Sequence, residues 1–159
     1  MLDNIPFIIC VAAIIYFLIS QSKGQKKRGK ISGDFKSCQQ LNSKTEQIFK
    51  HTLKKNLPNK WELHCKVRLA DLCKPKDPKN FTSLNKVTSK HVDYVVVEAY
   101  SSNILFAIEL DDSSHNTKKA KAQDKEKDYA LDSAGIELYR VKPGDNYHDA
   151  VEKIIAKHS

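Results

Sequence analysis

The sequence predicts a mixed α/β domain that follows an N-terminal membrane-spanning helix. Two observations predict the domain: strand-like runs rich in β-branched residues alternate with runs of helical period, and 159 residues suffice for one modest domain only. An unbroken apolar run, residues 5–19, predicts the helix before it. The expected order of elements in the domain is helix, three strands, helix, strand, helix, which gives a mixed central sheet flanked by helices.

The predicted anchor lies in residues 4–22, which carry no charge. At about 1.5 Å per residue, a helix of this length spans roughly 28 Å, close to the thickness of a bilayer core. A secretory signal peptide would need positive charge before the apolar run. Here five basic residues follow it instead: Lys23, Lys26, Lys27, Arg28 and Lys30. We therefore expect an uncleaved single-pass anchor in the inner (cytoplasmic) membrane of a bacterium, with the N-terminus outside and the remainder in the cytoplasm.

Residues 23–40 have the composition of a basic, flexible tether between the anchor and a domain at 41–159. Residues 1–30 have five positive charges and one negative, so they hold +4 of the net charge of +8, and the rest of the chain holds +4. We expect the five basic residues to contact anionic headgroups, or to be only the flank that stops translocation. The mildly basic remainder suits nucleic acid or a membrane surface and selects neither.

The first expected helix of the domain spans residues 44–56. Residues 43–46 have the S-x-x-E form of a capping box, and apolar residues follow at helical spacing until Asn56 and Pro58. Alternating apolar and polar residues predict a half-buried strand at 61–69, with Lys66 at one of the polar positions. Residues 70–90 contain two prolines and many lysines, so we expect a loop there.

The second half of the domain has clearer signals. Two β-branched runs, 92–98 and 104–110, are expected to pair as a hairpin. A helix at 116–133 should end at Gly135, followed by a short buried strand at 136–141 and a closing helix at 147–157.

Three carboxylates stand inside or at the ends of the hairpin strands, where an unpaired charge is costly to bury: Asp93, Glu109 and Asp111. If the hairpin turns about Ser101, Asp93 lies directly opposite Glu109, and Asp111 points to the same face because strand side chains alternate. A hard cation such as Mg²⁺, or Mn²⁺ in its place, would relieve their mutual repulsion. The alternative is that they face solvent or pair with lysines.

Further candidates follow the hairpin. His115 stands four residues after Asp111, and it is a metal ligand, a general base or an ordinary loop histidine. In the next helix, Asp124 and Lys127 share a stripe with apolar residues, so we expect them to look toward the sheet and reach the site. The other lysines of this helix could contact phosphates or form a solvated face.

These motifs resemble a bacterial domain of unknown function in the restriction-endonuclease-like PD-(D/E)XK superfamily, similar to the very-short-patch-repair endonucleases. The order D…E-x-D…H…D-x-x-K carries the resemblance, which covers the chain from about residue 40 to about residue 150. The matching segments are Lys66–Asp71, His91–Tyr94, Ala107–His115, Asp124 with Lys127 and Asp128, Ala134–Ile136, and Arg140. Glu46 also matches an acidic residue on the first helix of such nucleases, although its capping box explains it equally well.

The resemblance implies a nuclease core in which Asp93 and Glu109 hold Mg²⁺ and an activated water attacks a phosphodiester phosphorus. His115 would be a metal-site residue or the base. The third motif of the superfamily is E-x-K, and in this sequence the lysine position is Asp111. Either His115 or Lys127 replaces that lysine, or the fold has kept a metal site and lost hydrolysis.

The sequence thus predicts a membrane-anchored, Mg²⁺-dependent nuclease-like domain that acts on DNA rather than RNA, with no nucleotide cofactor. The expected catalytic residues are Asp93, Glu109, Asp111, His115 and Lys127, and the expected metal ligands are Asp93, Glu109 and His115. Two other classes of function stay open: a non-catalytic module that binds nucleic acid, and a membrane-proximal interaction domain whose carboxylates are structural.

Overall fold

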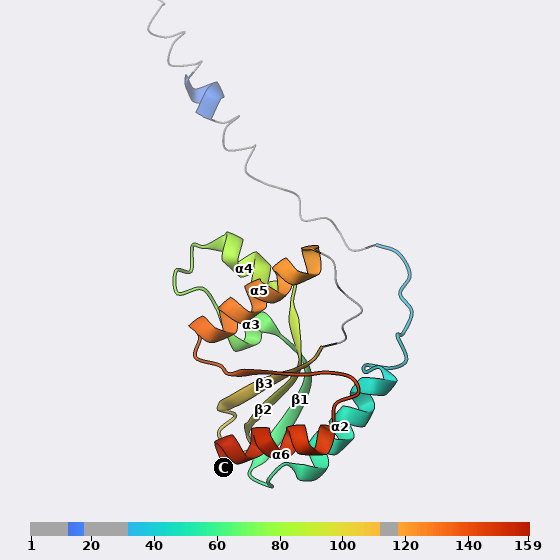
Figure 1. The fold of residues 1–159 in the computed structure, drawn as a ribbon. Helices are drawn as coiled ribbons and strands as arrows, with labels where there is room; N and C mark the ends of the chain where they lie inside the picture. Colours follow the sequence, from blue (N-terminus) through green and yellow to red (C-terminus); the bar gives the residue numbers. More distant parts are fainter. Residues whose placement is uncertain (1–12, 18–31, 112–117) are drawn as a thin grey trace, which may run out of the picture. The chain divides into compact units, whose positions relative to one another are not determined.

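The computed structural model describes residues 13–17, 32–111 and 118–159 (Figure 1). The chain divides into two compact units, Met1–Ser37 and Cys38–Ser159. In the first unit, residues 13–17 are helical, while the rest of the expected anchor and its five basic flanking residues lie outside the described residues. Among the residues that the structure describes, no helix combines the length and the hydropathy that a membrane crossing requires.

The second unit is built around a four-stranded mixed sheet in the order β1-β2-β3-β4. Strands β1 (Trp61–Arg68), β2 (His91–Glu98) and β3 (Ile104–Leu110) are antiparallel neighbours, and β4 (Leu138–Val141) pairs in parallel with β3. The predicted mixed α/β class is confirmed, and each of the four predicted strands is present within a few residues of its expected bounds.

The register of the hairpin also agrees with the sequence. Tyr94 lies opposite Ile108 and Val96 lies opposite Phe106, as expected for a turn about Ser101. A register shift follows between Val96 and Val97, on the turn side of these pairs. The irregularity therefore leaves the other end of the hairpin, where the carboxylates stand, in the expected register.

Helices cover both faces of the sheet (Figure 1). On one face, α2 (Lys44–Asn56) and α6 (Tyr147–His158) pack against the strands. The buried residues of this layer are Phe49, Leu53, Trp61, Tyr94, Val96, Phe106, Ile108, Val141, Val151 and Ile154. Burial of so many large apolar side chains, at about 25 cal/mol per Å², is the main force that fixes α2 on the sheet.

The opposite face carries α3 (Leu69–Leu72), α4 (Phe81–Thr88) and α5 (Lys118–Ser133). Their buried contacts with the sheet come from Leu69, Ala70, Val87, Val92, Val95, Val97, Ala107 and Leu131. Because Leu131 anchors α5, the same side of this helix brings Lys127, one turn earlier, to the sheet.

The stretch 70–90 is not the loop that its prolines and lysines predict, because it contains most of α3 and all of α4. These helices have only 4 and 8 residues, too few for a helical period to stand out. The side chain of Asn80 caps the first turn of α4, and the Val87 side chain in its last turn is buried. Pro75 and Pro78 lie between the two helices, where a proline interrupts no helical hydrogen bond.

Local signals set the helix ends near the site. Ser43 Oγ accepts a hydrogen bond from the Glu46 N–H (3.3 Å), and the Ser43 N–H donates to Glu46 Oε2 (2.7 Å), which completes the predicted capping box of α2. Past the end of α5, Gly135 has a φ of 73°, a value that favours glycine, and its N–H donates to the carbonyl of Asp132. Both ends therefore follow from residues that the sequence singles out.

Candidate functional site

The hairpin register brings Asp93 and Glu109 together. The pairing of Tyr94 with Ile108, continued by one residue, places Asp93 opposite Glu109, and the N–H of Leu110 donates to Asp93 Oδ2 (3.1 Å). The two carboxylate residues are only 8% and 9% exposed. Two carboxylates buried this deeply need compensating charge. In the structure, each of them has its own lysine.

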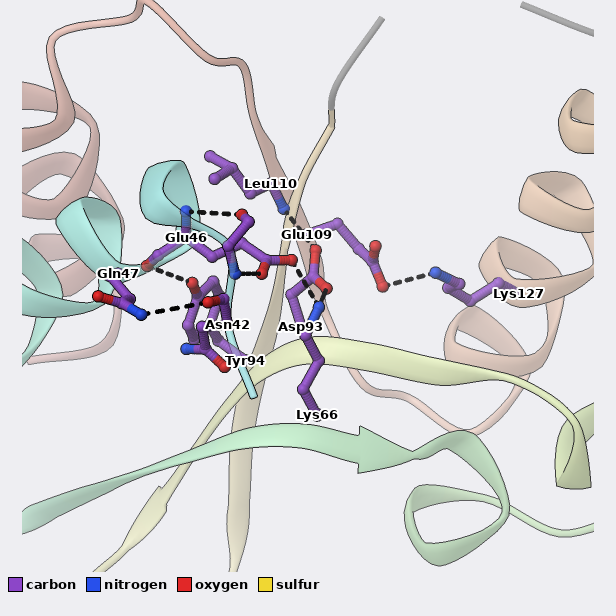
Figure 2. A network of polar contacts seen from close by, with 10 residues as sticks. Asn42, Glu46, Gln47, Lys66, Asp93, Tyr94, Glu109, Leu110 and Lys127 are labelled. Atoms are coloured by element: carbon purple, nitrogen blue, oxygen red, sulfur yellow. Dashed lines mark hydrogen bonds and ion pairs between the residues drawn. The ribbon is translucent and has the colours of Figure 1, made fainter. Parts of the chain in front are cut away.

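Lys66, on β1, is the partner of Asp93. The β1–β2 register places it across from Asp93, and its Nζ lies 2.7 Å from Asp93 Oδ1 and 2.5 Å from Glu46 Oε1 (Figure 2). The Lys66 side chain is 20% exposed. Burial by itself would lower the pKa of Lys66, but its hydrogen bonds to Asp93 and Glu46 outweigh burial, and the pKa is raised. Lys66 is therefore a cation held between two carboxylates.

The backbone of Lys66 is also unusual. Its φ is 54°, in the left-handed region that non-glycine residues seldom adopt. Such a conformation costs on the order of 1–3 kcal/mol and persists where the surroundings over-determine it. Pairing is regular on both sides, with Cys65 opposite Tyr94 and Val67 opposite Val92. The strain is thus confined to the one residue of β1 that forms the two ion pairs.

Glu46 belongs to the helix cap and to the site at once. Its Oε2 accepts from the Ser43 N–H, while its Oε1 faces the Lys66 ammonium. The Tyr94 hydroxyl donates to the Glu46 carbonyl and so fixes the first turn of α2 on β2. Burial would raise the pKa of Glu46, but hydrogen bonds from Lys66 and Ser43 outweigh it and hold the pKa below its ordinary value. The contacts of Glu46 therefore agree both with a role in the helix cap and with a role in the site.

Lys127, on α5, is the partner of Glu109. Its Nζ lies 2.6 Å from Glu109 Oε1, and each side chain is 12% exposed. Burial raises the pKa of Glu109, and the nearby Asp93 raises it too, while Lys127 only partly offsets them. An ionised Glu109 would therefore be stabilised by a further cation. The expectation that Lys127 looks toward the sheet is confirmed.

A cavity of about 220 Å³ opens beside this ion pair. It is lined by Ser89, Lys90, His91, Glu109, Asp124 and Lys127. Asp124, the other residue expected to face the sheet from this helix, therefore reaches the same cavity. In Figure 2 the Asp93 carboxylate lies between those of Glu46 and Glu109, with Lys127 on the far side of Glu109. The cavity thus reaches the cluster of three carboxylates, Glu46, Asp93 and Glu109, from the Glu109 side.

Asp111 has a different partner from the other two strand carboxylates. Its side chain is 44% exposed, and Arg140 Nη1 lies 3.4 Å from its Oδ2. Arg140 Nη2 also lies 2.7 Å from Asp128 Oδ1. Asp111 thus belongs to a partly exposed ion-pair group with Arg140 on β4 and Asp128 on α5. His115 lies outside the described residues.

The carboxylate oxygens of this site are the type of ligand that Mg²⁺ takes. Glu46, Asp93 and Glu109 carry three negative charges against the two positive charges of Lys66 and Lys127, which leaves one negative charge in excess. Mg²⁺ is commonly held by one or two carboxylates together with waters and substrate phosphates. No group of three or more His, Cys, Asp and Glu side chains in the described part of the chain is arranged to hold a metal. Asp93 and Glu109 would supply two carboxylate ligands at most, with water and substrate oxygens in the other positions.

Lys66 is the site residue that the sequence pattern misses. It occupies a polar position of an alternating strand, so periodicity points it toward solvent, whereas the structure makes it half-buried. The missing signal is cross-strand register, because the pairs Cys65–Tyr94 and Val67–Val92 bring Lys66 and Asp93, which lie between them, to the same place.

Comparison with known proteins identifies a family. No curated protein and no solved structure matches the chain. The family described as "Protein of unknown function (DUF2726)" matches residues 38–157. The match takes in most of the chain and nearly all of the compact unit Cys38–Ser159, including every site residue named above. The chain therefore belongs to the DUF2726 family.

Proposed function

We propose that this DUF2726 domain is a Mg²⁺-dependent nuclease-like enzyme that hydrolyses phosphodiester bonds of DNA. The observation that carries the proposal is the pair of buried carboxylates, Asp93 and Glu109, on adjacent strands. Each has a half-buried lysine within 2.7 Å, and the cluster still has excess negative charge. A site of this kind stabilises a divalent cation and, through it, an anionic phosphodiester.

The order of elements supports a restriction-endonuclease-like core. The helix α2, the antiparallel strands β1, β2 and β3, the helix α5 and the parallel strand β4 follow the αβββαβ order expected from the resemblance. The short helices α3 and α4 are an addition after β1. In this arrangement the two metal-binding carboxylates come from the central hairpin, as the resemblance implies.

In this proposal Asp93 and Glu109 hold Mg²⁺, which when bound supplies a Lewis acid for the phosphoryl oxygens. Lys127 holds the Glu109 carboxylate in place through its ion pair. Lys90 and His91 line the cavity beside Glu109, and in this proposal they contact the substrate backbone, Lys90 by exchanging its ion pair with Glu126 for a phosphate. His115 stays a candidate base.

A second candidate function is a non-catalytic module that binds nucleic acid. Its motivation is Asp111, which occupies the lysine position of the third motif and pairs with Arg140. In addition, Asp93 and Glu109 each already have a lysine partner, so the fold is electrostatically supported without metal. This candidate predicts DNA binding that needs no divalent ion.

The test uses the full chain in mild detergent, with plasmid, single-stranded DNA and RNA, in Mg²⁺, Mn²⁺ or EDTA. We expect cleavage of DNA that needs the metal and is lost in Asp93→Asn and in Glu109→Gln. Lys157→Met, which breaks an exposed ion pair between α6 and Glu137 outside the site, should cleave normally. Metal-independent binding without cleavage would favour the second candidate, and neither binding nor cleavage would contradict both.

A further inference from the structure

The Lys66 ammonium lies between two carboxylates and contacts an oxygen of each. Its Nζ is 2.5 Å from Glu46 Oε1 and 2.7 Å from Asp93 Oδ1, and the two carboxylates come from different elements, α2 and β2. No comparable bridge exists at Lys127, whose described ion pair is with Glu109 alone. Lys66 is thus the cation that joins two acidic groups, and Lys127 is the counterion of one.

The way in which Lys66 is held distinguishes it from a surface lysine. It stands on a sheet strand, its backbone is left-handed, and its side chain is one-fifth exposed. Glu46 is itself fixed, because Ser43 binds its Oε2 and Tyr94 binds its carbonyl. The Leu110 N–H fixes Asp93 Oδ2 in the same way. Both carboxylates that Lys66 meets are therefore held by other contacts, each through the oxygen that Lys66 does not touch.

We propose that Lys66 is a positioning residue that acts as the built-in second cation of this site. Hydrolytic sites with two metal ions place them roughly 3.5–4 Å apart around shared carboxylates. Here the ammonium takes the place between Glu46 and Asp93, so the chain binds one divalent ion, at Asp93 and Glu109. This inference rests on the proposed function, because it assumes that Asp93 and Glu109 bind a divalent ion.

The experiment is a calorimetric titration of the full chain in mild detergent with Mn²⁺, which reports stoichiometry independently of cleavage. We expect one Mn²⁺ per wild-type chain and two per Lys66→Met chain, since the substitution leaves Glu46 and Asp93 facing each other without a cation. Adding Glu46→Gln to Lys66→Met should return the value to one. Lys66→Arg, which keeps the charge, and the distant control Lys157→Met should both stay at one.

The outcomes separate this inference from the proposed function. A Lys66→Met chain that still binds one Mn²⁺, or a wild-type chain that binds two, would overturn the inference and leave the proposed function standing. A wild-type chain that binds none would overturn both. If Lys66→Met folds only with Mn²⁺ present, judged by circular dichroism, the metal has replaced the ammonium as expected. If it stays unfolded at saturating Mn²⁺, the role of Lys66 is not that of a replaceable cation.

Discussion

The hydroxyl of Tyr94 donates a hydrogen bond to the main-chain carbonyl of Glu46, with 2.6 Å between the two oxygens. Tyr94 directly follows Asp93 on β2, and Glu46 lies in the first turn of α2. This hydrogen bond therefore fixes α2 on β2 at Glu46, the residue whose carboxylate contacts Lys66. Burial raises the pKa of the Tyr94 hydroxyl above its ordinary value, which is already well above neutral pH, so the hydroxyl keeps the proton that it donates.

Removing this hydroxyl should loosen the helix. Tyr94→Phe keeps the ring in its buried place and is expected to lower the free energy of unfolding by about 1 kcal/mol, the usual net value of such a hydrogen bond. Urea denaturation measures the change. Tyr100→Phe is the matched control, because Tyr100 is fully exposed in the hairpin turn and should leave stability unchanged. Equal stability of the two variants would contradict the role given to the Tyr94 hydroxyl.

Stability should depend on pH through Glu46. The pKa of Glu46 is lower in the folded state than its ordinary value of 4.5. Its contribution to stability is therefore complete above about pH 4.5 and is lost as the pH falls through the folded-state value. Glu46→Gln cannot titrate, so the difference in unfolding free energy between wild type and this variant should shrink below pH 4.5 in urea titrations. A difference that stays constant there would contradict the ion pair with Lys66.

Asp111 and Glu109 should differ in their effect on cleavage, although both stand in the E-x-D segment. Glu109→Gln removes a metal ligand and is expected to slow cleavage more than about 100-fold. Asp111→Asn affects an exposed ion pair with Arg140 and should change the rate by less than about threefold, below 1 kcal/mol. Initial rates at saturating Mg²⁺ give the comparison. Equal losses in the two variants would place Asp111 in the site.

The N-terminal segment should hold the protein in the membrane. Residues 4–22 carry no charge and five basic residues follow them, so the full chain is expected to stay in the membrane pellet after an alkaline carbonate wash. A chain that lacks residues 1–22 should move to the supernatant. Release of the full chain by the same wash would contradict the proposed anchor.

The hairpin shows how far the sequence can predict this site. Strong β-branched runs and a short turn define the register, which has the predicted pairing up to Tyr94 and Ile108, the residues next to Asp93 and Glu109. Lys127 follows from helical spacing in the same way, because Leu131 buries that side of α5. These predictions succeed because they depend on contacts between neighbouring segments of the chain.

Contacts between distant segments could not be predicted in this way. The meeting of Lys66 with Asp93 depends on the pairing of β1 with β2, which 22 intervening residues separate, and periodicity alone assigns Lys66 to solvent. Helices α3 and α4 could not be predicted for another reason. With 4 and 8 residues, they are too short to show a helical spacing of apolar residues. Asp111 pairs with Arg140 from β4, a contact that local alternation cannot reveal.

Direct measurement of metal binding tests the central claim, that Asp93 and Glu109 hold the divalent ion. Electron paramagnetic resonance of Mn²⁺ mixed with the full chain in mild detergent reports the bound fraction whether or not DNA is cleaved. The account predicts that wild type binds Mn²⁺ and that Asp93→Asn and Glu109→Gln each lose this binding while remaining folded. Binding that is absent in wild type, or unchanged in both variants, would contradict it.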